Sequence, residues 1–146
     1  MELDYDDPTI EKQWCAERQA EVADYLRHEA VTYGRVGEWP AWHLAPYVSV
    51  WAVESASRPN WLGFWVLCGD LPTDYVSAET IKHPRDAIRA IAQRWLEASS
   101  VMAQGKRPEF LNVGSIEDAK ELAPMLESRA SLLMDWVNDE ELWEDE

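Results

Sequence analysis

The chain has 146 residues, 47% of them hydrophobic, and a formal net charge of −15 at pH 7. This length fits one domain, and this apolar content excludes an intrinsically disordered chain. The charge is uneven, because residues 1–30 carry −6, residues 31–114 carry zero and residues 115–146 carry −9. A negative field repels phosphate backbones and anionic lipids, so we expect neither nucleic acid nor a membrane as partner, whereas basic proteins are attracted.

The sequence also indicates where the protein resides. No run of about 18 apolar residues exists, so no transmembrane helix is expected. The acidic N-terminus, residues 1–7, lacks the basic and apolar regions of a signal peptide. The two cysteines, Cys15 and Cys68, give no disulfide framework. We therefore expect a cytoplasmic monomer or homodimer with free thiols and no cofactor.

The first expected element is a helix over residues 8–30. Asp7 is a good N-cap and Pro8 suits the first helical position. Ile10, Trp14, Val22, Tyr25 and Leu26 recur at near-helical spacing, with the polar Arg18 in the same series. Residues 34–46 contain two glycines and two prolines, which predicts irregular structure with at most a short edge strand.

Two extended runs follow, over residues 47–54 and 61–68, both rich in Val, Trp and Phe. The polar spacer between them contains Pro59 and predicts a hairpin with a loose loop. In the first run, Tyr47, Ser49, Trp51 and Val53 share one face. Neither run has a polar face. We therefore expect other parts of the chain to cover both faces of the hairpin, or to cover one face while a partner protein binds the other. Residues 68–75 read as a loop.

The C-terminal third is predicted to be helical. One helix begins at Pro84, buries Ile88, Ile91, Trp95, Ala98 and Met102, and ends before Gly105. A short strand over 108–113, a short helix ending at Ala123-Pro124 and a last helix beginning at Pro124 follow. An acidic, flexible tail starts at about residue 138. The order predicts a single α+β domain over residues 1–146, in which a small antiparallel sheet packs against an N-terminal helix and two or three C-terminal helices.

Three segments carry a family resemblance: residues 39–49 (WPAWHLAPYVS), 68–75 (CGDLPTDY) and 82–85 (KHPR). With these segments the chain resembles a bacterial family catalogued only as a domain of unknown function, over about Trp14 to Trp143. The resemblance implies a small soluble bacterial protein, and it transfers no catalytic residue.

The chain has nine tryptophans, and five of them fall between residues 39 and 65. For Trp51, Trp61 and Trp65, in the predicted strands, we expect packing in a core poor in phenylalanine. Loop aromatic residues less often serve packing alone. Trp39, Trp42 and Tyr47 are therefore candidates to line a pocket or anchor an interface, with core packing as the alternative.

His43 with Glu38, Asp70 and Asp74 forms a candidate catalytic rim at the ends of the extended runs. A histidine beside carboxylates can act as a general base. Asp70 and Asp74 are also turn-forming residues that bond their own backbone, and we favour that structural role. Cys68 with His43 and Asp70 is a weaker nucleophile candidate, because a cysteine ending a buried strand is more often inert.

Lys82, Arg85 and Arg89 form a basic patch in an otherwise acidic chain. Arg85 and Arg89 are four residues apart and share a helix face. The patch can bind an anionic ligand, or it can receive the acidic tail of its own or a neighbouring chain, and we favour this pairing. No metal site is expected, because His28, His43 and His83 show no ligand spacing.

These features favour a non-enzymatic, acidic, tryptophan-rich interaction or regulatory module that engages a protein partner. The chain contains no compact catalytic motif, so an enzyme is less expected. The alternative is a small-molecule-binding protein or hydrolase that uses the rim of His43, Glu38, Asp70 and Asp74. That alternative requires these side chains to converge on a concave pocket.

Overall fold

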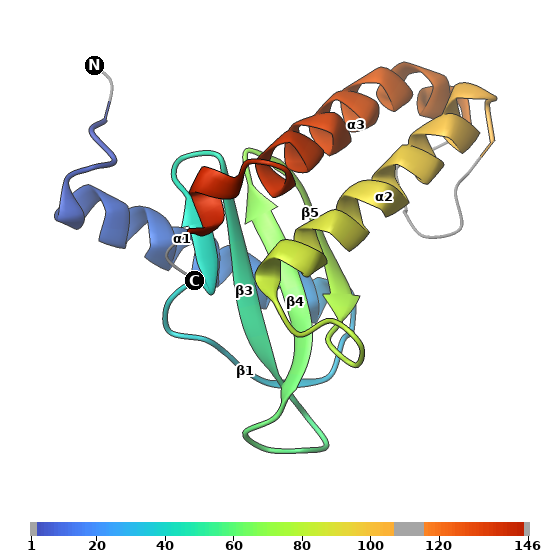
Figure 1. Cartoon of the computed structure of the whole chain (residues 1–146). Coiled ribbons are helices and arrows are strands. Elements are labelled where there is room, and N and C mark those ends of the chain that lie inside the picture. Colours follow the sequence, from blue (N-terminus) through green and yellow to red (C-terminus); the bar gives the residue numbers. More distant parts are fainter. Residues whose placement is uncertain (1–2, 107–115, 145–146) are drawn as a thin grey trace. The chain divides into compact units, whose positions relative to one another are not determined.

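A computed structural model of the chain describes residues 3–106 and 116–144. The backbone divides into two compact units, Met1–Ala87 and Ile88–Glu146. The first unit contains helix α1 and a five-stranded antiparallel sheet, and the second contains helical segments (Figure 1). The predicted α+β class is confirmed. The extent of a single domain over residues 1–146 stays a prediction.

Helix α1 spans Pro8–His28, in agreement with the predicted helix. The carboxylate of Asp7 accepts the N–H of Thr9 at 2.8 Å, which caps one of the free donors of the first turn. Trp14, Val22 and Leu26 of the predicted stripe are buried. Cys15 is buried beside them, so the buried face of α1 is wider than the predicted stripe.

The sheet consists of β1 (Tyr33–Val36), β2 (Trp42–Leu44), β3 (Val48–Ser55), β4 (Leu62–Gly69) and β5 (Leu71–Ser77). The strand order is β1-β3-β4-β5, and β2 pairs with the other half of the β3 edge. The predicted hairpin is therefore confirmed as β3 and β4, with Ser49 opposite Cys68 and Trp51 opposite Val66. The segment expected to be irregular supplies the two short strands β1 and β2.

The prediction of a loop over residues 68–75 was wrong except at Asp70, because β4 continues to Gly69 and β5 begins at Leu71. A tight turn follows β4, and β5 then runs antiparallel to β4, with Asp74 opposite Leu67. The sequence is typical of a loop because Pro72 has no backbone N–H to donate to a neighbouring strand. An edge strand tolerates proline, since one of its sides has no neighbouring strand. Pairing with β4 therefore outweighs the local turn signals.

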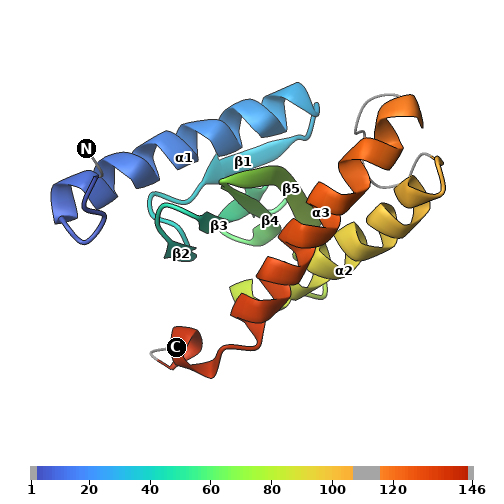
Figure 2. The ribbon, with the colours of Figure 1, turned by 90° about the horizontal axis from the view of Figure 1, so that it is seen from above.

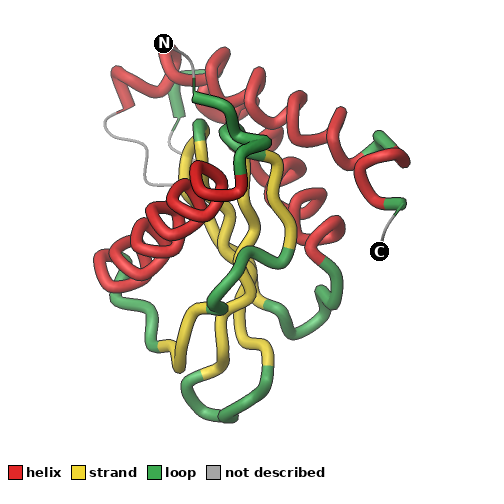
Figure 3. The backbone as a smooth tube through the Cα atoms, turned by 90° about the vertical axis from the view of Figure 1, so that its left-hand side faces the viewer, coloured by secondary structure: helices red, strands yellow, loops and turns green. Residues whose placement is uncertain are grey.

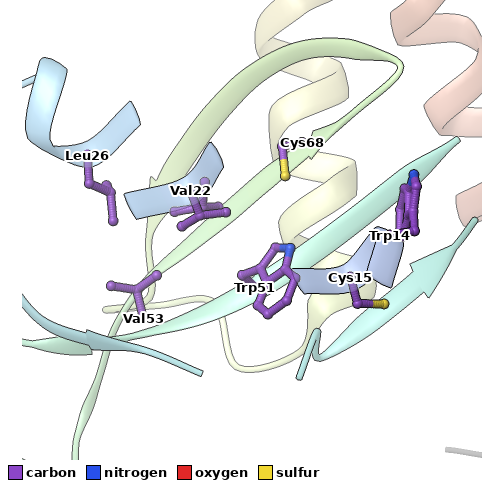
Figure 4. Packing of buried hydrophobic residues seen from close by; sticks show 8 residues of the cluster. Trp14, Cys15, Val22, Leu26, Trp51, Val53 and Cys68 are labelled. Atoms are coloured by element: carbon purple, nitrogen blue, oxygen red, sulfur yellow. The ribbon is translucent and has the colours of Figure 1, made fainter. Parts of the chain in front are cut away.

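One face of the sheet is covered by α1 (Figure 2). Trp51 and Val53 of β3 and Val66 and Cys68 of β4 pack against the buried side chains of the helix (Figure 4). Val48, Val50 and Leu67, which alternate with these residues, are buried as well. On this second face, the indole N–H of Trp65 donates to the backbone oxygen of Ile81 at 2.9 Å.

The second unit contains most of α2 (Pro84–Ala103) together with α3 (Ile116–Val137), which lie side by side (Figures 1 and 2). The predicted stripe of α2, from Ile88 to Met102, is buried. Buried residues recur in α3 at intervals of three and four, namely Ala123, Leu126, Ala130, Leu133 and Val137. The strand predicted over 108–113 falls outside the described residues.

The predicted break at Ala123-Pro124 was wrong, because α3 continues through Pro124. Proline removes one backbone hydrogen bond and crowds the preceding turn. Burial of Ala123 and Leu126 on either side of Pro124 offsets this cost.

Part of the segment predicted to be a flexible acidic tail is helical. Glu140–Trp143 form the short 3-10 helix η1, and the carboxylate of Asp139 accepts the N–H of Glu141 at its start. Trp143 is only 6% exposed, and its indole N–H donates to the backbone oxygen of Trp136 at 3.0 Å. This indole fixes η1 to the end of α3.

Gly69 is the position where the sheet is least tolerant of a side chain. Its φ is +147°, and an added Cβ would collide with the backbone oxygen of Tyr47. We expect Gly69→Ala to lower the free energy of unfolding by about 2 kcal/mol or more. Gly37→Ala is the control, because its Cβ would meet its nearest atoms at an ordinary 3.4 Å. Equal effects of the two variants in urea unfolding would contradict this account.

Pro124 is exposed inside α3, so its ring contributes little packing. We expect Pro124→Ala to raise the free energy of unfolding by about 1–3 kcal/mol, because it restores an N–H donor and removes a clash. Ser128→Ala, also exposed in α3, changes helix propensity alone and should add at most about 0.5 kcal/mol. Thermal or urea unfolding measures both, and a destabilised Pro124→Ala would contradict the prediction.

Candidate functional site

His43 lies on β2 and pairs with a carboxylate of α1. Its Nε2 is 3.0 Å from Oε2 of Glu11. The imidazole stacks against the ring of Trp14 with centroids 6.2 Å apart, and the ring of Trp39 meets it edge-on at 5.5 Å. One histidine thus connects α1, β2 and the loop before β2.

The described contacts do not join His43 to Glu38, Asp70 or Asp74, the carboxylates predicted to share its rim. Asp70 occupies the turn after β4, where its N–H donates to the backbone oxygen of Tyr47 at 2.9 Å. Asp74 lies within β5 and is only 3% exposed, and its Oδ1 accepts the N–H of Tyr75 at 2.8 Å. Asp74 therefore bonds its neighbouring backbone, as favoured, although in a strand rather than a turn.

Sequence reasoning missed Glu11 as the partner of His43. The two residues are 32 positions apart, and no local motif connects them. The only available signal is that Glu11 precedes Trp14 by three positions, which places both on neighbouring parts of the helix surface. Pairing with His43 becomes visible only once α1 lies against the sheet.

Cys68 does lie in the same cross-strand row as His43, with Ser49 of β3 between them. Its thiol is 3.3 Å from the hydroxyl of Ser49 and 3.7 Å from the backbone oxygen of Arg18. Burial raises the pKa of the Cys68 thiol to about 11. The sulfur is therefore protonated near neutral pH, which is the opposite of an activated nucleophile.

The three aromatic residues proposed for binding have different surroundings. Trp42 is buried in β2 and belongs to the core. Trp39 is 48% exposed and Tyr47 is 51% exposed, and they lie at either end of the segment that contains β2. The core prediction was wrong for Trp61, which precedes β4 and is 59% exposed. Trp51 and Trp65 are buried, as predicted.

The basic residues of the predicted patch lie before and within α2. The ammonium group of Lys82 donates to the backbone oxygen of Ala78 at 3.1 Å. Arg85 and Arg89 are half-buried on α2, and the N–H of Arg85 is held by Nδ1 of His83 at 3.0 Å. The binding role of these three residues stays a prediction.

The described part of the chain shows neither a metal centre nor a helix suited to cross a membrane. No group of three or more His, Cys, Asp or Glu side chains there is arranged to hold a metal ion. In residues 3–106 and 116–144, no helix combines the length and apolar character needed to cross a bilayer.

The state of the thiols can be tested directly. Cys15 and Cys68 are both buried, and burial raises the pKa of each thiol to about 11. We expect neither to react with a thiol reagent such as DTNB at pH 7.4 in the folded chain, because the thiolate is scarce and covered. Both should react in guanidinium chloride, which serves as the control. Rapid labelling of Cys68 in the folded chain would contradict this.

Comparisons with known proteins place the chain in a family. No curated protein and no solved structure matches it. A family model described as a domain of unknown function, DUF4826, matches residues 9–143 and so includes both units. The match agrees with the resemblance carried by residues 39–49, 68–75 and 82–85. On this match over nearly its whole length, the chain belongs to the DUF4826 family.

Proposed function

We propose that this chain is a non-enzymatic interaction module that binds a basic protein through an acidic-aromatic surface, defined as Glu38, Trp39, Tyr47 and Asp70. The exposure of Trp39 and Tyr47 carries the proposal. Each keeps about half of its surface in water, although most other tryptophans are buried. Trp and Tyr are enriched among the residues that dominate binding energy in protein interfaces.

Trp39 is held in place by its neighbours rather than by a core of its own. Its ring meets His43 edge-on, with an angle of 87° between the ring planes. His43 is in turn held by Glu11 and Trp14. A side chain fixed in this way loses little conformational entropy when a partner covers it, so exposure and order together favour binding.

The charge around these aromatic residues favours a basic partner. Glu38 is exposed and adjacent in the chain to Trp39. Asp70 is also exposed, and its backbone N–H donates to the backbone oxygen of Tyr47. The exposed Asp4, Asp6 and Asp7 precede the turn of α1 that carries Glu11. Carboxylates and aromatic faces both attract Lys and Arg side chains, by charge pairing and by cation–π contact.

The proposal predicts that a double variant, Trp39→Ala with Tyr47→Ala, loses binding while remaining folded. The full chain, immobilised, is exposed to an extract of its native cells, and captured proteins are quantified by mass spectrometry. We expect capture of basic proteins that falls at least about fivefold in the double variant, since interface aromatics are often worth 1–2 kcal/mol or more. Raising the salt concentration from about 50 to 300 mM should also reduce the capture of basic proteins.

Met125→Ala is the matched control, because Met125 is an exposed apolar residue of α3 outside the acidic-aromatic surface. It should leave capture unchanged, and circular dichroism confirms that each variant is folded. Capture that the double variant retains, or that salt does not affect, would overturn the proposal.

A further inference from the structure

The loop between β3 and β4 is fixed by its own hydrogen bonds. The N–H of Ser55 donates to the oxygen of Trp61 at 2.8 Å, and the N–H of Trp61 donates to the oxygen of Arg58 at 3.0 Å. The N–H of Arg58 donates to the hydroxyl of Ser55 at 3.3 Å. This ordered loop projects from the end of the hairpin (Figures 1 and 3), away from the β2 end of β3.

The loop presents an arginine in cation–π contact with a tryptophan. The guanidinium carbon of Arg58 is 4.3 Å from the ring centroid of Trp61, whose side chain is 59% exposed. The ring contacts one side of the guanidinium, and the five N–H donors of an arginine give it further capacity for other partners. No carboxylate in the described part of the chain lies within ion-pair distance of Arg58, although the chain has 28 acidic residues.

A groove of about 230 Å³ adjoins this pair. Its lining combines apolar and charged groups, among them Arg35, Gly37, Val53, Glu54, Asn60 and Trp61. Glu54 accepts the N–H of Asn60 at 2.7 Å and lies 3.8 Å from Nε of Arg35, so its charge is engaged. The apolar part offers room for a single aliphatic side chain.

The local charge differs from that of the whole chain. Arg35 and Arg58 are both exposed here, whereas Glu54 is half-buried and already engaged. The exposed Glu38 follows Gly37 of the groove lining, so the charges around the groove balance locally, in contrast to the −15 of the chain. Repulsion from acidic groups more than about 8 Å away is largely screened at physiological salt. A short acidic segment therefore meets attraction at this loop, whereas a long polyanion would extend to the surrounding negative surface.

We propose that the β3–β4 loop and its groove bind an acidic peptide segment of a partner protein. A carboxylate of the segment accepts hydrogen bonds from the guanidinium edge of Arg58, and a neighbouring aliphatic side chain enters the groove beside Trp61. This site is distinct from the acidic-aromatic surface and takes a ligand of opposite charge, so the two proposals fail independently.

The test uses the full chain labelled with ¹⁵N and the peptide acetyl-Leu-Glu-Leu-Glu-amide as probe. The signal of the Trp61 indole N–H is assigned from its loss in Trp61→Phe. We expect saturable shifts of this signal and of the Asn60 and Gly37 amides. Acetyl-Leu-Gln-Leu-Gln-amide, the neutral equivalent, should bind at least about fivefold more weakly, because it lacks charge-assisted hydrogen bonds.

Arg58→Gln should lower the affinity for the acidic peptide by about five- to twentyfold. Arg58→Lys should lower this affinity less, because lysine keeps the positive charge but lacks the planar guanidinium group. Arg27→Gln is the matched control, since it removes one exposed positive charge that α1 already pairs with Asp24 at 3.1 Å. It should leave the affinity within about twofold.

Three results would overturn the proposal. The first is no saturable shift up to about 10 mM peptide. The second is an equal loss of affinity in Arg58→Gln and Arg27→Gln, which would show general electrostatics rather than a site. The third is tighter binding of a thymidine hexanucleotide than of the peptide, which would assign the loop to single-stranded nucleic acid instead.

Discussion

The structure of the first unit depends on how one buried indole satisfies its hydrogen-bonding group. Trp51 is fully buried between β3 and α1, and its N–H donates to the hydroxyl of Ser49 at 2.9 Å. Ser49 in turn lies 3.1 Å from the backbone oxygen of Cys68, to which its hydroxyl donates. A buried N–H without an acceptor costs about 1–3 kcal/mol, so this chain of bonds favours one register between β3 and β4. A shift of one residue would move Ser49 and Trp51 to the other face.

The position of the candidate surface follows from this register. Ser49 pairs with Cys68 on one side and with His43 on the other, so His43 occupies the same row of the sheet. Because α1 covers this face, Glu11 and Trp14 are the groups that His43 meets, and Trp39 then rests on His43. The half-exposed Trp39 is thus placed by contacts that begin in the core.

The two proposed surfaces share no residue, but they come close together at Gly37. Tyr47 precedes β3 and Arg58 follows it, whereas Glu38 and Trp39 follow the groove residue Gly37. The rigid hairpin between them gives each surface a fixed backbone. A module of this kind would contact a basic group through Trp39 and Tyr47 and an acidic group through Arg58, without sharing residues between the two sites.

The sequence alone determined the elements whose residues repeat with a clear period. Helix α1, the β3–β4 hairpin and the buried stripe of α2 follow from local spacing and from Asp7, Pro8 and Pro84, because these signals act over a few residues. The hydrogen bond between Asp74 and its neighbouring backbone was likewise predicted from the local sequence. The carboxylate that pairs with His43, Glu11, was not predicted, because the choice among distant carboxylates has no local signal.

Only the tertiary structure decided the rest. Residues 71–77 form β5 and α3 continues through Pro124, since strand pairing and burial outweigh the local preference of proline for turns and helix ends. Trp42 is buried while Trp39 and Trp61 are exposed, although all three precede or begin strands with similar composition. Their exposure depends on which face another element covers, and that is set by contacts between residues far apart in the chain.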